Sequence, residues 1–512
     1  MNLARAAAIV GSNTMLSRVL GFVRDVLIAR VLGAGVASDA FFVAFKLANF
    51  LRRLFAEGAF NAAFVPLFSR TLEAEGRAAA KRFAEEALAG LSLVLLVVVL
   101  LAELFMPQLV GFIAAGYGQD DPRLALAIEL SYVTFPYILF ISLAALFGGL
   151  LNAVGKFGAA AFAPVLLNIV LITAMLLAHL HPEGPAHALA WGVAVAGVAQ
   201  LLWVVRAAWR EGYALRLRAP SWSPRVRRLA RLILPGAVGA GVYQINMLID
   251  LWFASHLPAG AQSYLFYADR LVQLPLGVIG VAVGTALLPL LSREVAGDRP
   301  ERAAGTLNRA IHFAMLLTLP ATAALVLIAG PIVTGLLERG AFDRAASSAT
   351  AATLQAFALG LPAYVLVKVM APAFFAREDT TTPVIVAAVA LVANVALILL
   401  LIDQMAHVGI ALATAGATWV NVSLLALLLH RRGFFRPDRW LLGRLARSTL
   451  ATLGMAIVLV VVDRQTADWP ALFRLAALVG TGGATFAVLA LATGAVPRSL
   501  VDLVLRRRPA DG

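Results

Sequence analysis

Four stretches of the chain run for more than twenty residues without a charged side chain. They are Leu130–Gly155, Thr380–Ile402, Gln404–His430 and Leu475–Pro497. A helix needs about 20 mostly apolar residues to cross the hydrocarbon core of a bilayer. Only 14% of the 512 residues are charged, whereas about 25% are charged in an average soluble domain. The chain is therefore predicted to be an all-α integral membrane protein.

Further, less uniform apolar segments bring the predicted number of transmembrane helices to fourteen. Basic residues are concentrated in alternate loops, with eight arginines from Arg206 to Arg231 and six from Arg431 to Arg447. The loops between them hold few basic residues, namely Arg123, Arg339, Arg344, Arg464 and Arg474. Because loops rich in Lys and Arg stay in the cytoplasm, both termini are predicted to be cytoplasmic. The same pattern explains the net charge of +14 without a nucleic-acid partner.

An internal similarity suggests that the chain contains two related halves. Segment Asp39–Arg70 aligns with Gln262–Arg293 without insertions or deletions, and the two segments end in PLFSR and PLLSR. Chance similarity between two apolar helices is one interpretation. Duplication of a six-helix bundle is the other, and it would insert both copies in the same orientation. Duplication predicts an N-terminal lobe at 1–218, a C-terminal lobe at 219–435, and two further helices with a basic tail at 436–512.

Several charged residues fall inside the predicted membrane helices. Each costs at least about 2.5–3.5 kcal/mol at mid-bilayer on insertion scales. The basic ones are Arg18, Arg24, Arg30, Lys46, Arg52, Arg53, Arg270 and Lys368, and the acidic ones are Asp25, Asp39, Glu57, Asp250 and Asp269. Asp39, Lys46, Arg53 and Glu57 are spaced so that they share one helix face. Such groups must line a wet cavity, form pairs or reach an interface.

Two interpretations account for these charges. Buried ion pairs that stabilise the bundle would explain Asp25, Asp39, Glu57 and Asp269, since each has a possible basic partner. The arginines outnumber those acids, and Arg30 and Lys368 are expected only to reach an interface. Surplus guanidinium groups in a cavity favour an anionic substrate. Each stays protonated and can bind two phosphate oxygens at once. A diphosphate group is the ligand that this pattern fits best.

Three segments resemble the lipid II flippase family, MurJ. They are SRVLGFVRD at Ser17–Asp25, the charged stripe within Ala37–Pro66, and YADRLVQLPLGVIGVAVGTALLP at Tyr267–Pro289. The resemblance implies two six-helix lobes around a central cavity, with the last two helices forming a groove that faces lipid. It implies a multi-pass protein of the bacterial inner membrane. The implied activity is transfer of the undecaprenyl-diphosphate-linked peptidoglycan precursor to the outer leaflet by alternating access.

The resemblance also implies roles for particular residues. Cavity arginines of the family match Arg18, Arg24, Arg52 and Arg270, and the helix-face pattern adds Arg53. Acidic residues that position them match Asp25, Asp39, Glu57 and Asp269. Some relatives are thought to hold a sodium ion, for which Asp250, Asn394 and Thr414 are the candidate ligands here. Ile398 stands where a second carboxylate would complete that site, and one carboxylate supplies few of the oxygens that a hard cation takes.

Other functions remain open on sequence alone. The same fold could export another lipid-linked or amphipathic substrate, although a cationic drug would call for more acidic groups. A membrane-embedded enzyme would need a catalytic cluster, and neither an HExxH motif nor a phosphate-binding loop is present. A structural scaffold would not need the charged stripes. The expected partners are lipid II, membrane lipids and cell-wall synthesis proteins, with a monomer as the functional unit. No cofactor is expected apart from sodium or membrane-potential coupling.

Overall fold

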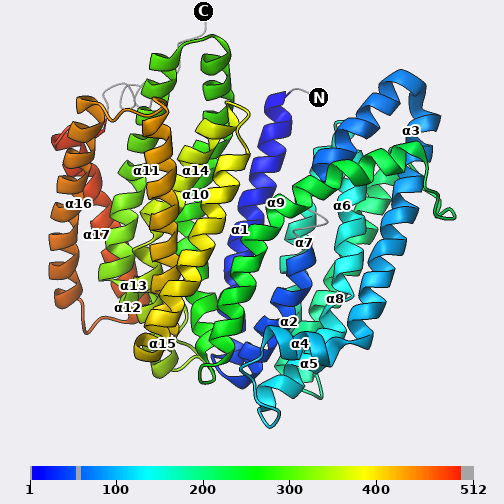
Figure 1. Cartoon of the computed structure of the whole chain (residues 1–512). Coiled ribbons are helices and arrows are strands. Elements are labelled where there is room, and N and C mark those ends of the chain that lie inside the picture. The colour runs from blue at the N-terminus through cyan, green and yellow to red at the C-terminus, as the bar shows by residue number, and fades with distance from the viewer. Residues whose placement is uncertain (1–2, 53–58, 497–512) are drawn as a thin grey trace, which may run out of the picture. The chain divides into compact units, whose positions relative to one another are not determined.

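Helices form all the regular secondary structure in residues 3–52 and 59–496, which are the residues that the computed structural model describes. This agrees with the predicted all-α class. The chain packs as two compact units (Figure 1). Unit 1 comprises Met1–Ser263 together with Arg339–Phe342, and unit 2 comprises Tyr264–Glu338 together with Asp343–Gly512.

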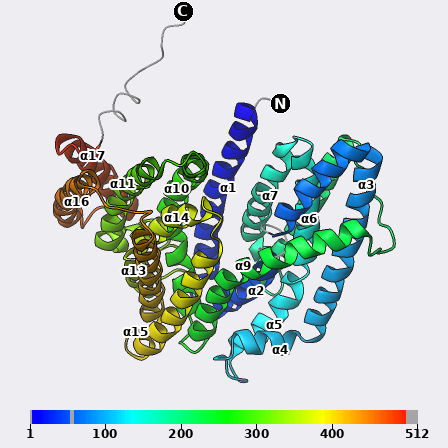
Figure 2. The same ribbon diagram turned by 45° about the horizontal axis from the view of Figure 1, so that its top comes forward.

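In unit 1, α1 packs against α7, α7 against α8, and α3 against both α6 and α9. Figure 2 shows α6 beside α3. Its elements are α1 (Leu3–Leu32), α2 (Val36–Arg52), α3 (Ala59–Leu104), α4 (Met106–Ile113), α5 (Pro122–Thr134), α6 (Tyr137–Ala153), α7 (Phe157–Leu176), the 3-10 helix η2 (Ala178–Leu180), α8 (Pro185–Arg210) and α9 (Pro224–Ser255). Proline begins α5, α8 and α9, where its missing N–H is not needed. Gly76, with φ of 82°, bends α3 into two helical parts.

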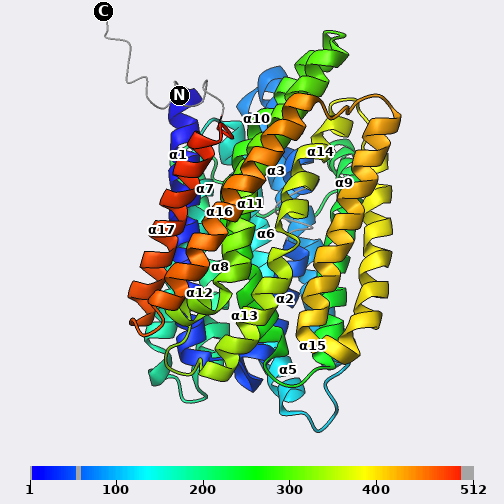
Figure 3. The ribbon, with the colours of Figure 1, turned by 90° about the vertical axis from the view of Figure 1, so that its left-hand side faces the viewer.

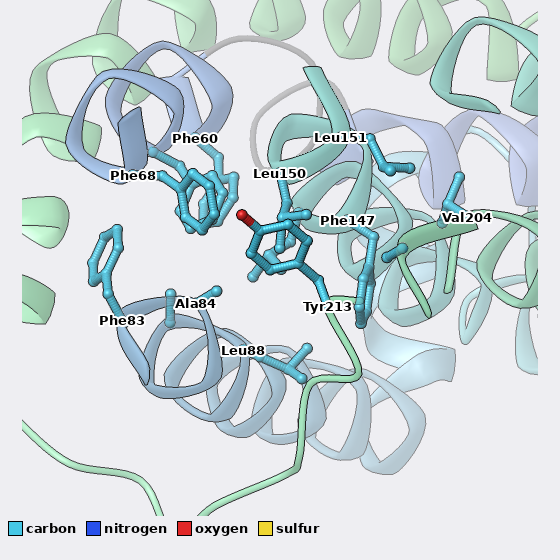
Figure 4. Packing of buried hydrophobic residues seen from close by; sticks show 14 of the residues in the cluster. Phe60, Phe68, Phe83, Ala84, Leu88, Phe147, Leu150, Leu151, Val204 and Tyr213 are labelled. Atoms are coloured by element: carbon cyan, nitrogen blue, oxygen red, sulfur yellow. The ribbon is translucent and has the colours of Figure 1, made fainter. Parts of the chain in front are cut away.

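An aromatic cluster holds α3 inside unit 1. Phe60, Phe64 and Phe68 recur at every fourth position, so their rings lie on one face of the helix, and all three are buried. Phe64 stacks on Phe83 with 5.6 Å between ring centroids. Phe68 meets the ring of Tyr213 edge-on at 5.9 Å, and Figure 4 shows Tyr213 reaching into this cluster. Burial of each such ring contributes about 1.5–3 kcal/mol.

Unit 2 ends in a helical hairpin that packs on the helices before it. Its elements are α10 (Ala261–Ala296), whose first turn belongs to unit 1, α11 (Pro300–Leu327), α12 (Ala329–Leu336), α13 (Arg344–Ala358), α14 (Leu361–Phe375), α15 (Thr381–Arg431), α16 (Arg439–Gln465) and α17 (Ala471–Ala492). The hairpin consists of α16 and α17, which lie side by side (Figure 3), with α16 against α11 and α17 against α12. Ala406, with φ of 47°, divides α15 into two helical parts.

Helix boundaries recur along the chain at the offset that relates Asp39 to Gln262. Helix α4 begins at Met106 and ends at Ile113, and at this offset α12 begins at Ala329 and ends at Leu336. The last residues of α1 and α9 show the same spacing. Gly212 after α8 and Gly433 after α15, whose spacing is shorter than this offset by two residues, share positive φ angles of 78° and 75°. This agreement extends well beyond the two similar segments and favours duplication over chance.

The compact units and the predicted lobes divide the chain at different places. Helix α9 would be the first helix of the second copy, yet it packs within unit 1. The lobe boundaries at 218 and 435 follow from the repeat in the sequence, whereas the units follow from packing. The lobe boundaries therefore stay a prediction.

Each copy contributes a loop that contacts the first helix of the other copy, and both contacts lie in unit 1. The Ala341 N–H donates to the carbonyl oxygen of Arg30, near the end of α1, at 2.9 Å. A Cβ atom on Gly340 would lie 2.4 Å from that oxygen, so only glycine fits. In the other copy, the Gly116 N–H donates to the Ser255 hydroxyl at the end of α9, at 2.9 Å. The two contacts join corresponding loops and helix ends of the repeat, although they are made at different positions.

Asp39 of α2 caps the first turn of α10. Its buried carboxylate accepts hydrogen bonds from the Gly260 N–H at 2.7 Å, the Ser263 N–H at 2.9 Å and the Ser263 hydroxyl at 2.6 Å. The guanidinium of Arg123 lies 3.8 Å away. A helix N-terminus carries partial positive charge and unpaired N–H groups, so a carboxylate there is favourable. This helix therefore begins with a cap supplied by a distant part of the chain.

An ion pair joins equivalent positions in each copy, with the charges reversed. In unit 1 the Lys156 ammonium lies 2.9 Å from the Glu211 carboxylate. In unit 2 the Arg432 guanidinium lies 2.6 Å from the Asp379 carboxylate. Lys156 corresponds to Asp379 at the offset of the repeat, and Glu211 corresponds to Arg432 because each directly precedes the positive-φ glycine. Each pair links the segment before a helical hairpin to the segment after it.

Replacing Asp39 with alanine should destabilise the protein strongly. The substitution leaves the Gly260 and Ser263 donors without their acceptor. It also removes a nearby carboxylate from buried Arg123, which keeps its ion pair with Asp121. Removing one partner of a buried charged network costs about 3–5 kcal/mol. Thermal unfolding of the purified protein should therefore shift to lower temperature, and less so for Asp39→Asn, which keeps one acceptor oxygen. Asp120→Ala removes an exposed carboxylate from the same unit and serves as the control. Equal melting of Asp39→Ala and Asp120→Ala would contradict the capping role.

The Asp379 cluster should make a pH-dependent contribution to stability. Hydrogen bonds from Thr382, through its hydroxyl and its N–H, and from Arg432 lower the pKa of Asp379 from 3.8 to about 2. The stabilisation is therefore complete above pH 3.8 and is lost as the pH falls toward 2. Asp379→Asn should lower the free energy of unfolding at pH 6 by at most about 1 kcal/mol, because the ion pair is exposed. The unfolding temperature should fall accordingly. The difference from wild type should shrink below pH 4.

Thermal unfolding in detergent between pH 6 and pH 3 measures this effect. Asp403→Asn is the control, because Asp403 is an exposed carboxylate on α15, the helix that follows Asp379. A difference between wild type and Asp379→Asn that stays constant over this range would show that the carboxylate charge is not involved.

Candidate functional site

Arg24 of α1 is a buried cation whose position is determined by two neighbours. Its Nε and Nη2 atoms donate to Asp25 Oδ1 at 2.9 and 2.6 Å, and Arg24 as a whole is only 7% exposed. Its Nη1 atom donates to Asn168 Oδ1 of α7 at 2.9 Å. Asn168 is itself anchored, since its Nδ2 atom donates to the Ser17 carbonyl oxygen at 2.8 Å. The guanidinium is therefore neutralised by one residue and oriented by another.

This arrangement leaves part of the Arg24 guanidinium without an acceptor among the described residues. Of the five N–H groups that an arginine carries, three are used in the bonds to Asp25 and Asn168. One N–H remains on each of Nη1 and Nη2. A guanidinium keeps its proton in proteins and gains most from an oxyanion with paired oxygens. The arrangement is suited to binding an anion rather than to acid–base chemistry.

Arg18 lies on the same helix as Arg24 but is exposed. It forms no hydrogen bond or ion pair with any residue in the described ranges. Arg24 follows it at a spacing that corresponds to about 240° around a helix with 3.6 residues per turn. The two arginines therefore point in different directions. Asp25, which shares a helix face with Arg18, pairs with Arg24.

Arg270 and Asp269 of α10 are connected through one side chain in unit 2. The Arg270 Nη1 atom lies 3.4 Å from Gln273 Oε1, and Gln273 Nε2 donates to the Asp269 carboxylate. The guanidinium also lies 4.8 Å from the centre of the Phe266 ring, a distance at which a cation is attracted by the ring. Asp269, Arg270 and Gln273 thus form one connected polar group on α10.

Three predicted site residues cannot be placed in the same way. Arg52 is the last residue of α2, and its side chain is outside the described part of the structure. Arg53 and Glu57 lie in 53–58, which is also outside the described residues. Their roles stay predictions. Arg30 and Lys368 are exposed, and their reach to a membrane interface stays a prediction.

Asp39 contacts the start of α10 rather than an arginine of α1, as the cap described above. Lys46, which shares its helix face, has its ammonium 3.5 Å from Gln262 Oε1, a long hydrogen bond. The polar stripe of α2 therefore contacts the N-terminal end of α10 at two points. Both contacts lie within unit 1.

The candidate sodium ligands are distributed over both units. Asp250 of α9 belongs to unit 1, where Asn246 Nδ2 lies 3.4 Å from its carboxylate. Asn394 is buried in unit 2, and the Thr414 hydroxyl there donates to the Ile410 carbonyl oxygen at 3.0 Å. Ile398 is fully buried. Within residues 3–52 and 59–496, no group of three or more His, Cys, Asp or Glu residues is arranged to hold a metal ion. Sodium binding stays a prediction.

Sequence reasoning missed two residues that complete these networks. Asn168 is an isolated amide in an apolar helix, and a polar residue in a membrane segment usually has a partner there. That signal was present in the sequence but did not identify Arg24 as the partner. Arg123 was assigned to an outer loop, yet it is buried and its Nη1 atom donates to the Leu257 carbonyl oxygen at 3.0 Å.

Solved structures show the same fold. The chain superposes on the structure titled "Lipid II flippase MurJ, inward closed conformation" with a TM-score of 0.79 and 27% sequence identity, covering 98% of this chain and 100% of the other. It also superposes on an inward-facing multidrug transporter of the MATE family with a TM-score of 0.68, covering 83% and 98% of the two chains. At 17% identity this second similarity concerns the fold alone.

Sequence relatives agree with the structural match. The family model described as "Lipid II flippase MurJ" matches residues 28–480. A probable lipid II flippase MurJ of Rhizobium meliloti (strain 1021) is 44% identical over 473 residues, covering 92% of this chain and 88% of its own length. A lipid II flippase MurJ of Burkholderia cenocepacia is 36% identical over 465 residues, covering 90% and 89%. The chain therefore belongs to the lipid II flippase MurJ family.

Proposed function

We propose that this chain is a lipid II flippase of the bacterial inner membrane. It moves the undecaprenyl-diphosphate-linked peptidoglycan precursor from the cytoplasmic to the outer leaflet. The observation that carries the proposal is the Arg24 guanidinium, buried in an apolar bundle and held by Asp25 and Asn168 with two N–H groups left over. A diphosphate offers the paired oxygens that such a group binds. Family membership supplies the identity of the lipid.

The proposed topology has fourteen membrane spans with both termini in the cytoplasm. Nine helical stretches of the described residues are long and apolar enough to cross a membrane. One of them, Thr381–Arg431, contains two helical parts divided at Ala406. Helices α1, α2, α9 and α10 complete the set, and they carry most of the charged residues expected to bind substrate. The distribution of arginines between alternate loops sets the orientation.

The proposed mechanism is alternating access by two lobes. Arg18, Arg24, Arg52, Arg53 and Arg270 bind the diphosphate, while Asp25, Asp39, Glu57 and Asp269 position the binding groups. The polyprenyl tail stays in lipid along α16 and α17. Those helices expose large apolar side chains that suit a lipid tail, including Leu450, Leu453, Ile457 and Val488. The protein acts as a monomer alongside the cell-wall synthesis proteins that use its product.

The membrane potential is the proposed driving force. An inside-negative potential favours outward movement of an anion by about 2.3 kcal/mol per charge per 100 mV. A sodium ion held by Asp250, Asn394 and Thr414 is the second candidate for coupling, supported by the buried amide of Asn394. The protein's own residues supply only electrostatic binding and positioning in either case.

Rescue of a bacterium depleted of its own flippase tests the proposed function. The unmodified chain should restore growth, whereas Arg24→Ala and Arg270→Ala should fail at equal amounts in the membrane, because each removes a cation that binds the diphosphate. If the unmodified and well-expressed chain did not restore growth, the substrate assignment would be wrong. Full rescue by both variants would contradict the arginine mechanism.

Asn168→Ala should slow transport without removing the Arg24 charge. The variant loses the hydrogen bond that orients the guanidinium, and a hydrogen bond to a charged group contributes about 1.5–3 kcal/mol. Lipid II transfer in vesicles should therefore fall about tenfold or more. Thr173→Ala removes a hydroxyl from the same helix that bonds only to the Ile169 carbonyl oxygen, and it should transport normally. If Asn168→Ala matched Thr173→Ala, Asn168 would have no positioning role.

A further inference from the structure

A basic pocket of about 330 Å³ lies in unit 1 at the end of α8 and the start of α7. Its lining includes Ile9, Lys156, Phe157, Trp203, Arg206 and Arg210. Both helices are candidate membrane spans, and Lys156 and Arg210 mark their ends. The pocket therefore lies where the apolar part of the bundle meets water, and it opens between charged and apolar side chains.

The two arginines of this pocket have no counterion within the described chain. The Glu211 carboxylate, which also lines the pocket, forms its ion pair with Lys156, at 2.9 Å. Arg206 and Arg210 are exposed and form no hydrogen bond or ion pair with any residue in the described ranges. They are one helical turn apart on α8, an arrangement in which like charges repel and slightly destabilise a helix. The pair therefore does not stabilise α8 through contacts within the described chain.

An aromatic side chain continues the same helix face toward the apolar region. Trp203 lies just under one turn before Arg206, so the two side chains are neighbours. The indole N–H donates to the Ala159 carbonyl oxygen at 3.2 Å, and its ring lies 5.2 Å from the ring of Phe162. The side chain is still 40% exposed. Tryptophan in this position is typical of the lipid headgroup level.

The second copy of the repeat shows that these residues are not required by the fold. At the spacing that relates Glu211 to Arg432 and Gly212 to Gly433, Trp203 corresponds to Leu424 and Arg206 to Leu427. Arg210 alone has a basic counterpart, Arg431. The ion pair and the glycine turn are present in both copies, whereas the aromatic and the paired arginines occur in the first copy only. They therefore serve something other than the helical hairpin.

We propose that this pocket binds the phosphate diester headgroup of an anionic phospholipid. Arg206 and Arg210 bind the phosphate oxygens, and the acyl chains lie against Trp203, Phe157 and Ile9. Basic pockets between membrane helices on the cytoplasmic side bind anionic headgroups in this way. The leaflet follows from the proposed topology, but the site does not depend on lipid II being the transported substrate. Free phosphate shares the headgroup chemistry and lacks the apolar contacts.

Quenching of Trp203 fluorescence by brominated lipids tests the proposal at the site itself. The full chain is reconstituted in phosphatidylcholine vesicles that contain brominated phosphatidylglycerol or brominated phosphatidylcholine. The difference between wild type and Trp203→Phe isolates the Trp203 signal from the other tryptophans. Brominated phosphatidylglycerol should quench this signal at a concentration about tenfold lower than brominated phosphatidylcholine, since each basic residue near the surface adds to anion affinity.

Matched variants identify the groups responsible. The double variant Arg206→Gln/Arg210→Gln should abolish the preference for phosphatidylglycerol, whereas Arg431→Gln, the equivalent arginine of the second copy, should preserve it. Equal quenching by both lipids in wild type, or an unchanged preference in the double variant, would overturn the proposal. Displacement of phosphatidylglycerol by equimolar inorganic phosphate or undecaprenyl diphosphate would also overturn it, assigning the site to a soluble anion or to the substrate path. Lipid II transfer measured in the same vesicles reports separately on the proposed function.

Discussion

A buried charge inside an apolar bundle is the constraint on which this structure depends. An unpaired Arg24 would raise the free energy of placing this helix in the membrane. That cost is reduced because Asp25 compensates the charge and Asn168 accepts a hydrogen bond from a further N–H. The same contacts fix the direction of the guanidinium. Asn168 is in turn held by the Ser17 carbonyl oxygen on α1, so the helix that carries the arginine also anchors the residue that orients it. The proposed anion site and a contact between α1 and α7 are thus one arrangement.

Duplication explains how the helices around this charge are completed. Asp39 caps α10, a helix of the other copy, and loops at Gly116 and Gly340 contact the first helix of the opposite copy. Equivalent positions do not keep equivalent chemistry. The ion pair Lys156–Glu211 recurs as Asp379–Arg432 with the charges exchanged. Trp203 and Arg206 of the basic pocket beside Lys156 are replaced by leucines at the corresponding positions of the second copy. The repeat preserves helix ends and turns while individual side chains diverge.

Much of the fold could be predicted because apolar length and loop charge are local properties of the sequence. The helical class and the presence of charged residues inside α1 and α10 follow from them. The partners of those charges could not be predicted, since Arg24 and Asn168 are 144 residues apart and meet only through packing of α1 on α7. Nor could sequence spacing show that Asp25 would pair with Arg24, its neighbour, instead of Arg18 on its own face. Arg123 appeared to be a loop residue and is buried beside Asp39.

The central claim is that the oriented Arg24 guanidinium binds the diphosphate of the lipid substrate. The most direct test is the equilibrium dissociation constant of the purified protein for lipid II, measured for wild type and Arg24→Ala in bilayer discs of uncharged phospholipid. A lost hydrogen-bonded contact to a charged group corresponds to a Kd about 10- to 100-fold higher, and this is the result predicted for Arg24→Ala. An unchanged Kd in a folded Arg24→Ala protein would contradict the account.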